Sequence, residues 1–275
     1  MVRGVLLLTG GTGRVGSALL PLLLARREPV RCLVRDPRGL GPDRVRVQLA
    51  LGDLADPASF RHALRGVSTV VHLAASWRDQ PRARVEELDG DAAVRLVDTA
   101  ERAGVERFLL LSPLGAAPEH PLRAFRAKAL AEAAVLDSAA MQASVLRASV
   151  IHATGQRVPA FLAGAGDAPV QPIAAADVAA CVVAALERPG VHELAGPQTM
   201  RRRTYARLLR GHRPLRVPAP LLRPALRGYA ALAGPAAALT WDEAELVTVP
   251  MTTARGTAGA EALGVRPRRV GVTAR

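Results

Sequence analysis

The chain has 275 residues, 49% of them hydrophobic, which is enough for one substantial core with or without a small attached subdomain. Its net charge is +13, and arginine supplies 36 of its 37 basic residues because Lys128 is the only lysine. The arginines are scattered and few aromatic residues lie among them, so we expect a basic surface rather than a nucleic-acid interface.

Membrane spans, secretory signals and metal sites are not expected either. The apolar run "GVLLLTGG" ends in a glycine turn, and no apolar stretch approaches the ~20 residues of a membrane span. Cys32 and Cys181 lie in apolar segments without metal-ligand spacing, as buried thiols of a reducing compartment do. We therefore expect a cytoplasmic protein with no metal.

Short β-rich runs alternate with longer helical patterns through the first 150 residues or so. This alternation predicts a doubly wound α/β fold, in which a parallel sheet is covered by helices on both faces. Asp56 and Pro57 form a helix start, and the helical pattern of 85–104 closes on Gly104. The expected strands are 5–9, 30–34, 45–51, 69–75, 107–112 and 143–149.

The pattern changes beyond this point. A loop rich in Gly and Pro precedes a helix at 175–190 and a short strand at 191–196. We predict a core of residues 1–195, in which 151–171 line a substrate cleft, and a small C-terminal α/β subdomain, 196–275, integrated with that core.

Arginine and leucine are mixed in the segment 201–234. Such a segment could touch anionic lipid or a protein partner, which leaves a peripheral membrane contact open. Its prolines argue against a continuous amphipathic helix, so we favour a subdomain that lines a pocket for a substrate or partner.

The stretch "TGGTGRVG" lies between the first strand and the first helix. The spacing Gly11-x-Gly13-x-x-Gly16 fits the dinucleotide-binding fingerprint, in which glycines let the backbone turn tightly and approach a pyrophosphate. Backbone N–H groups and the helix dipole then meet the anion. The sequence predicts a nicotinamide dinucleotide site that includes Thr9, Gly10, Gly11, Thr12, Gly13, Arg14, Val15 and Gly16.

Arg35 stands at the end of the second strand, where an acidic residue would bind the ribose 2′-hydroxyl of NAD. Arginine can pair with a 2′-phosphate, so the pattern favours NADP(H) over NAD(H). Asp36, one place later, keeps NAD(H) open.

Two further pairs of residues complete the predicted cofactor site. Asp53 and Leu54 follow the third strand and are expected to flank the adenine. Ala74 and Ala75 end the fourth strand and are small enough for the cofactor to lie against them.

The ordered motifs "TGGTGRVG", "LVRDP", "GDLAD", "AKALAE", "LRASVIHATGQ" and "ELAGPQTM" resemble the extended or atypical short-chain dehydrogenase/reductase superfamily, with its Rossmann fold, over nearly the whole chain. The tail "LTWDEAELV…ALGVRPRRV" is similar to the branch that contains the nucleotide-binding accessory subunit of respiratory complex I. NmrA-like redox sensors and NAD-dependent epimerase-dehydratases are neighbouring branches.

The resemblance implies a catalytic Ser, Tyr and Lys, the last two spaced Tyr-x-x-x-Lys. The serine orients the substrate oxygen, the tyrosine passes a proton, and the lysine holds the nicotinamide ribose. Ser112 and Lys128 match the serine and the lysine, but Ala124 stands at the tyrosine position and has no proton to give.

Several other side chains are candidates for a role in or near the site. His152, after the sixth strand, is a candidate substitute for the missing proton donor, and His120 is a weaker one. His72 is interpreted as a core histidine, and Trp77 either caps the nicotinamide or packs. We expect a solvated helix face at four acidic residues, Glu86, Glu87, Asp89 and Asp91.

Two functions therefore remain open. One is an NAD(P)H-dependent oxidoreductase or epimerase-like enzyme whose proton comes from water, His152 or the substrate. The other is a non-catalytic NADP(H)-binding redox sensor, or an assembly or stability factor for a protein partner, because a binding role needs no tyrosine.

Overall fold

The computed structural model describes residues 4–80, 83–153, 161–234, 237 and 239–271. Seven strands form a parallel sheet in the order β11-β6-β5-β4-β1-β2-β3. The chain adds β2 and β3 on one side of β1 and then crosses back to add β4 on its other side. This is the doubly wound arrangement that the sequence predicts. The strands are β1 Val5–Thr9, β2 Val30–Val34, β3 Gln48–Leu51, β4 Val67–His72, β5 Arg107–Pro113, β6 Gln142–Ala148 and β11 Gly190–Leu194.

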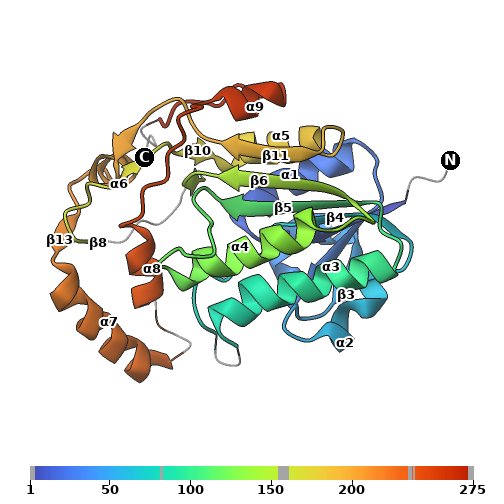
Figure 1. Cartoon of the computed structure of the whole chain (residues 1–275), viewed down its shortest axis with the longest axis horizontal. Coiled ribbons are helices and arrows are strands. Elements are labelled where there is room, and N and C mark those ends of the chain that lie inside the picture. Colours follow the sequence, from blue (N-terminus) through green and yellow to red (C-terminus); the bar gives the residue numbers. More distant parts are fainter. Residues whose placement is uncertain (1–3, 81–82, 154–160, 235–236, 238, 272–275) are drawn as a thin grey trace.

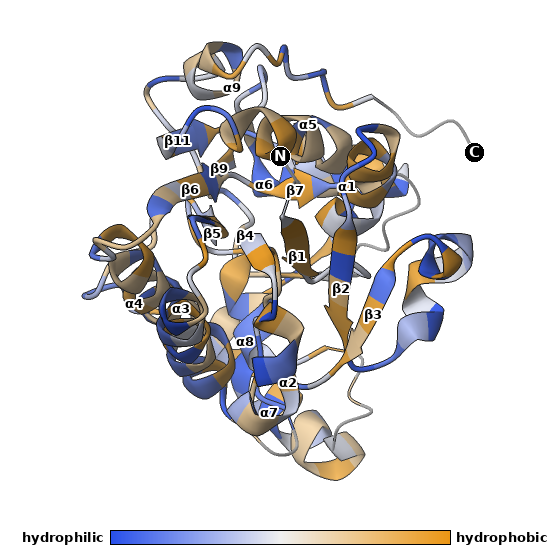
Figure 2. Cartoon of the chain, turned by 90° about the vertical axis from the view of Figure 1, so that its right-hand side faces the viewer, coloured by the Kyte–Doolittle hydropathy of each residue, from blue (hydrophilic) through white to orange (hydrophobic). Residues whose placement is uncertain are grey.

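Helices cover both faces of the sheet (Figure 1). On β1, Leu6 and Leu8 join the core cluster beneath one helix pair, whereas Leu7 joins the cluster beneath the other. Strands buried on both faces are apolar throughout rather than alternating, which is why β1 reads as an unbroken hydrophobic run. Figure 2 shows these strands between the two helix layers, which are α1 Arg14–Ala25 with α5 Ala175–Ala185, and α3 Ala92–Arg102 with α4 Arg123–Leu136.

Shorter helical segments connect these elements. The Asp56 side chain accepts a hydrogen bond from Ala58 N at 3.0 Å, which confirms the predicted start of α2, Pro57–Phe60. The predicted strand 45–51 begins late, at Gln48, because Val45 ends a 3₁₀ segment that runs through Pro42. The remaining segments are η1 Pro37–Val45, η2 Arg61–Leu64 and η3 Glu87–Asp91, the last of which is a π-helix.

Most of the C-terminal elements lie beyond the carboxyl ends of the central strands (Figure 1). Three small strand pairs occur there: β7 Ile151–His152 with β10 Ile173–Ala174, β8 Phe161–Ala163 with β13 Leu215–Val217, and β9 Pro169–Val170 with β12 Met200–Arg201. The helices are α6 Arg202–Arg210, α7 Ala219–Ala233, α8 Trp241–Leu246 and α9 Ala258–Ala262. Helix α9 packs back on β11, where Ala260 and Leu263 join the main core cluster. A division of the chain at residue 195 stays a prediction.

The segment 201–234 is not one continuous helix, as its prolines predicted, because β13 separates α6 from α7. Helix α7 itself runs for 15 residues and contains two of these prolines. Pro220 lies in the first turn, where backbone N–H groups have no helical acceptor, and Pro224 removes a single internal hydrogen bond. None of the described helices is long and apolar enough to cross a membrane.

Candidate functional site

A cavity of about 630 Å³ opens where β1, β2 and β4 end. Its position is the point at which the strand order reverses, where doubly wound sheets bind their ligands, and its size suits a small molecule. Of the residues predicted to hold the cofactor, those that line the cavity are Thr9, Gly10, Gly11, Thr12, Gly13, Arg35, Asp53, Leu54, Ala74 and Ala75.

The glycine loop is shaped by close backbone contacts. Gly10 has a φ of +73°, and a Cβ there would lie 2.6 Å from the backbone N of Ala74. A Cβ on Gly16 would lie 2.2 Å from the carbonyl oxygen of Gly10. Both positions therefore require glycine, and the start of α1 is held against the cavity with Gly13 as its N-cap. This cradle fits a pyrophosphate.

Three of the residues predicted to hold the cofactor do not line the cavity but support the loop that does. Val15 is buried in the core beneath the loop, and Gly16 sets the approach of the helix. Arg14 Nη1 donates a hydrogen bond to the carbonyl oxygen of Ile151 at 3.0 Å, which ties the start of α1 to β7.

At the far end of the cavity, Arg35 is exposed and has no ionic or hydrogen-bonded partner among the described residues. Asp36 is engaged by Arg38, whose Nη2 lies 2.7 Å from its Oδ2 and whose backbone N donates to its Oδ1 at 2.9 Å. Hydrogen bonds from the Arg38 side chain and backbone lower the pKa of Asp36. Among the described residues, the Arg35 guanidinium is therefore available to a ligand, whereas the neighbouring carboxylate of Asp36 is bound by Arg38.

Lys128 is fully buried in α4, and its Nζ donates a hydrogen bond to the carbonyl oxygen of Ala74 at 3.1 Å. Burial lowers the pKa of this lysine, while Asp89 and Glu132 act in the opposite direction. The ammonium group therefore lies directly behind the cavity wall that Ala74 forms. An ammonium has three donors, so two remain after the bond to Ala74.

Ser112 ends β5 and is buried, and its Oγ has no hydrogen-bond partner among the described residues. Ala124 is a buried residue of α4. Neither Ser112 nor Lys128 contributes to the lining of the cavity. A catalytic role for Ser112 stays a prediction.

His152 lies on β7, and its Nε2 is buried without a partner in the described part of the chain. Its ring meets the Tyr205 ring edge-on, with 6.5 Å between centroids. Burial lowers the pKa of His152, so the imidazole is neutral near pH 7 and a weak proton donor. The next residues, 154–160, belong to the predicted cleft segment 151–171 and lie outside the described residues.

The aromatic candidates have packing partners. His72 is buried beside Thr9, whose Oγ1 lies 2.7 Å from Nδ1, which agrees with a core role. The Trp77 ring packs near Phe125, with 6.3 Å between centroids, and His120 stacks on the same phenylalanine at 4.3 Å.

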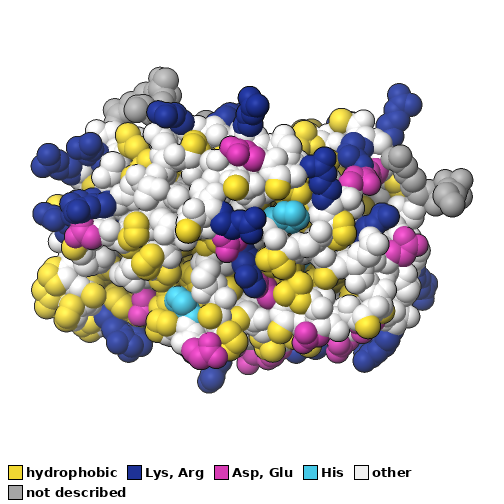
Figure 3. Space-filling view, turned by 45° about the horizontal axis from the view of Figure 1, so that its top comes forward, with side chains coloured by type: hydrophobic (Ala, Val, Ile, Leu, Met, Phe, Trp, Pro, Cys, Tyr) yellow, Lys and Arg dark blue, Asp and Glu magenta, His cyan; other side chains and the backbone are white. Residues whose placement is uncertain are grey.

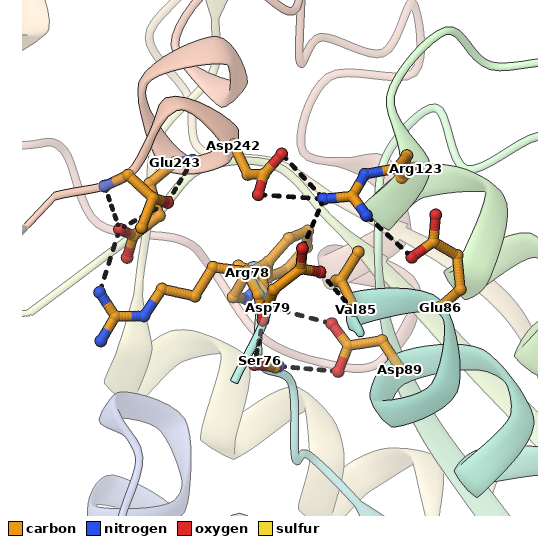
Figure 4. Close-up of polar contacts among 11 residues, drawn as sticks. Ser76, Arg78, Asp79, Val85, Glu86, Asp89, Arg123, Asp242 and Glu243 are labelled. Carbon is orange, nitrogen blue, oxygen red and sulfur yellow. Dashed lines mark hydrogen bonds and ion pairs between the residues drawn. The ribbon is translucent and has the colours of Figure 1, made fainter. Parts of the chain in front are cut away.

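Asp89 is buried and does not belong to a solvated helix face, so that interpretation is wrong. Only 2% of it is exposed, it lines the cavity, and its carboxylate accepts hydrogen bonds from the backbone N of Ser76 at 2.7 Å and of Trp77 at 3.1 Å (Figure 4). These bonds hold the turn that follows the fourth strand, in which Trp77 has a φ of +61°. The four-residue spacing from Val85 through Asp89 to Ala93, both neighbours being buried, was the available signal.

A second group that the sequence does not reveal joins α8 to the start of α4 (Figure 4). Arg123 Nη2 lies 3.2 Å from Asp79 and 3.1 Å from Asp242. Its Nη1 lies 3.2 Å from Glu86, so Glu86 forms an ion pair instead of only facing solvent. The ion pairs hold α8 against the start of α4.

An ion pair between Arg78 and Glu243 also joins α8 to the turn after β4, and it lies at the cavity itself. Arg78 Nη1 lies 3.4 Å from Glu243 Oε2, and both residues line the cavity. Glu243 also accepts a hydrogen bond from the backbone N of Thr240, which closes the capping box of α8. The C-terminal part of the chain thus contributes directly to the wall of the site.

Comparison with known proteins identifies the family. The NAD(P)H-binding family matches residues 10–189, about two thirds of the chain. The chain belongs to that family. It is an extended or atypical short-chain dehydrogenase/reductase, as the motifs indicate, and it binds a nicotinamide dinucleotide. Its place in the accessory-subunit branch stays a prediction.

Two relatives of this NAD(P)H-binding protein have different roles. An NAD(P)H azoreductase from Xenophilus azovorans is 30% identical over 207 residues, which cover 71% of this chain and 69% of that one. The photosystem II assembly factor Ycf39 of Trieres chinensis is 31% identical over 108 residues, which cover 39% of this chain and 34% of that one. The chain spans most of the azoreductase but only about a third of Ycf39.

The fold has close structural counterparts. A UDP-glucose 4-epimerase from Thermotoga maritima, solved with UDP-glucose, superposes with a TM-score of 0.74 over 98% of this chain and 96% of that one. The two sequences are 16% identical, so this likeness concerns the fold alone.

Proposed function

We propose that this protein is an NADP(H)-dependent oxidoreductase that reduces an acceptor for which no tyrosine proton donor is needed. The observation that carries the proposal is Lys128, the chain's only lysine, which is fully buried behind the cavity wall with its Nζ on the carbonyl of Ala74. Burying an ammonium is costly, and Nζ makes one hydrogen bond among the described residues. We infer that its two other donors serve ribose hydroxyls beside Ala74, which lines the cavity in front of Lys128.

Ala124 limits the acceptor. Reduction of an ordinary carbonyl creates an alkoxide, a strong base, and a positioned acid accelerates such steps typically ~10²–10⁴-fold. A quinone forms a far weaker base than an alkoxide, a phenolate, when it accepts a hydride, so water can supply the proton. An azo compound would leave a nitrogen anion, so it must take its proton from water or from its own hydroxyl group as the hydride arrives. The likeness to an NAD(P)H azoreductase over 71% of the chain supports an acceptor of this class.

The reaction balances without a protein acid. NADPH, when bound, supplies one hydride. One azo nitrogen accepts that hydride and the other takes a proton from water, so the N=N bond becomes an N–N single bond with one hydrogen on each nitrogen. The chain's own contribution is to hold the ribose through Lys128 and the pyrophosphate through the glycine loop.

Arg35 supports the preference for NADP(H). It is exposed at the cavity and unpaired among the described residues, whereas the carboxylate of Asp36 is already bound by Arg38. A 2′-phosphate would pair with a free guanidinium, while a 2′-hydroxyl would need a carboxylate that Arg38 occupies.

The cofactor preference is tested by titrating the full chain with NADPH and NADH. We expect NADPH to bind at least about tenfold more tightly, the effect of one charge-assisted contact. In Arg35→Gln the NADPH affinity should fall by a similar factor while NADH binding is unchanged. Arg44→Gln, an exposed arginine outside the cavity, is the control. Equal affinities for the two cofactors would refute the argument from Arg35.

The acceptor class is tested by following nicotinamide oxidation with azo dyes, quinones and simple carbonyl compounds. Turnover with the first two classes and only slow reaction with carbonyls is the expected result. Carbonyl reduction as fast as in relatives that have the tyrosine would show that another group supplies the proton.

A non-catalytic role is the second candidate, because Ala124 lacks a proton donor and part of the chain resembles an assembly factor over 108 residues. In that role the chain would bind NADP(H) as a redox sensor, or would stabilise a protein partner. Tight NADPH binding without turnover on any of the three acceptor classes would favour this candidate. A cytoplasmic location stays a prediction under both.

A further inference from the structure

The positive charge of the chain is concentrated in one segment. Residues 195–241 contain nine of the 37 basic residues and none of the 24 acidic ones. The described elements of this segment, α6, β13 and α7, lie at one end of the molecule (Figure 1). The rest of the chain is nearly balanced in charge, so this end carries most of the field that an anionic partner would meet.

A second cavity, of about 240 Å³, lies between α6 and the segment that enters β13. It is lined by Arg203, Thr204, Arg207, Arg213, Pro214 and Arg216, without a carboxylate. Arg203 is paired with Asp167. The other three arginines are exposed and have no partner among the described residues. Guanidinium groups that converge in this way repel one another, and an anion between them removes that repulsion.

Large apolar side chains are exposed beside these arginines. Leu215 on β13 is 71% exposed, and Leu221 and Leu232 on α7 are 67% and 91% exposed. Helix α7 is held by its opposite side, where Leu222 and Leu226 pack against Trp241. Figure 3 shows hydrophobic side chains gathered at this end of the molecule next to a group of basic ones. We call the arginines of the second cavity and these three exposed leucines the basic-apolar face.

We propose that the basic-apolar face docks on an anionic phospholipid bilayer. The arginines would take the lipid phosphates, and the exposed leucines would enter the boundary between headgroups and acyl chains. A bilayer surface offers both an array of anions and an apolar layer, and amphipathic surface helices use that combination.

Charge and composition favour this partner over two others. A second copy of the chain carries a net charge of +13 and has no acidic residue on the matching segment, so it would be repelled. Nucleic acid could pair its phosphates with the arginines, but it has no apolar layer for the exposed leucines. Bases stack on aromatic side chains, and leucines do not provide that stacking surface.

The test measures sedimentation of the full chain with vesicles of phosphatidylcholine alone and of phosphatidylcholine mixed with phosphatidylglycerol. We expect binding to the mixed vesicles only, weakened by added salt. Replacing two arginines in Arg207→Gln/Arg213→Gln should weaken binding about 30-fold, because each cation near an anionic bilayer contributes about fivefold. The same charge change at two exposed arginines outside the face, Arg61→Gln/Arg102→Gln, is the control and should have a much smaller effect.

The apolar part is tested by Leu232→Ser, which should also weaken binding to the mixed vesicles. Leu136→Ser, at a leucine that is 41% exposed on α4, is its control. NADPH affinity, measured on every variant, reports that the chain is folded. No binding to the mixed vesicles would overturn the proposal, as would equal effects of the face and control variants. Binding of an oligonucleotide or inorganic phosphate that depends on these arginines, without vesicle binding, would assign the face to a soluble anion instead.

Discussion

His72 makes acid stability a direct test of how the fourth strand is built. The side chain is fully buried beneath the cavity, and burial, followed by the charge of Lys128, lowers its pKa from 6.5 to about 3. In the unfolded chain the imidazole takes up a proton below pH 6.5, but in the folded chain it stays neutral until about pH 3. The unfolded state therefore binds more protons in this window, and the folded state loses stability as the pH falls through it.

The size of the loss follows from the shift. Each pKa unit corresponds to about 1.4 kcal/mol, so this one histidine should remove about 3 kcal/mol of the free energy of unfolding between pH 7 and pH 4. That is a large part of the ~5–15 kcal/mol by which natural domains are stable.

The assay is denaturant unfolding at both pH values, in the native chain and in His72→Asn. Asparagine can still bond to Thr9, which lies 2.7 Å from His72 Nδ1, but it does not titrate. Its packing cost is the same at both pH values and cancels. The variant should lose about 3 kcal/mol less than the native chain between the two conditions. His62→Asn, at an exposed histidine, should lose as much as the native chain. An equal loss in all three proteins would refute the reasoning.

Two further substitutions test the residues behind the cavity. Lys128→Met should weaken NADPH binding at least about tenfold, and it should also lower stability, because the buried carboxylates of Asp89 and Glu132 lose a nearby cation. Titration with NADPH and thermal unfolding measure the two effects, with Arg126→Met as the control. Unchanged affinity would remove the ribose assignment. Asp89→Asn weakens two charge-assisted hydrogen bonds to the turn 76–77, so it should reduce the free energy of unfolding in denaturant by about 2 kcal/mol. Asp91→Asn, at an exposed aspartate, is the control and should change that free energy little.

The sheet could be predicted from the sequence because its signal is local. Strands β1 and β2 begin and end where the predicted runs of 5–9 and 30–34 do, since strands covered on both faces are mostly apolar, with Arg31 as the exception in β2. The glycine loop is equally local, because steric demands fall on Gly10 and Gly16 themselves. The late start of β3 is not predicted, since a few turn residues shift a boundary without changing the pattern around it.

The rest of the site depends on contacts that sequence spacing does not reveal. Glu243 reaches the cavity from 165 residues beyond Arg78, with which it pairs. Asp89 turns inward through a π-helical segment, where the helical count changes and a surface interpretation fails. Glu243 looks like an ordinary polar position in the chain, and only the packing of α8 beside the cavity gives it a role, whereas Asp89 has the spacing from Val85 and Ala93 as a weak signal.

The start of α4 explains how the chain keeps a cofactor site without the usual proton donor. Arg123, beside Ala124, holds α8 through Asp242, and Phe125 on its other side is buried under the stacked ring of His120. Both neighbours of Ala124 therefore have packing or ion-pair partners, while Lys128, one turn later, still hydrogen-bonds to the cavity wall at Ala74. We infer that this helix start contributes to structure and cofactor binding, so any reduction depends on an acceptor that can take its proton from water.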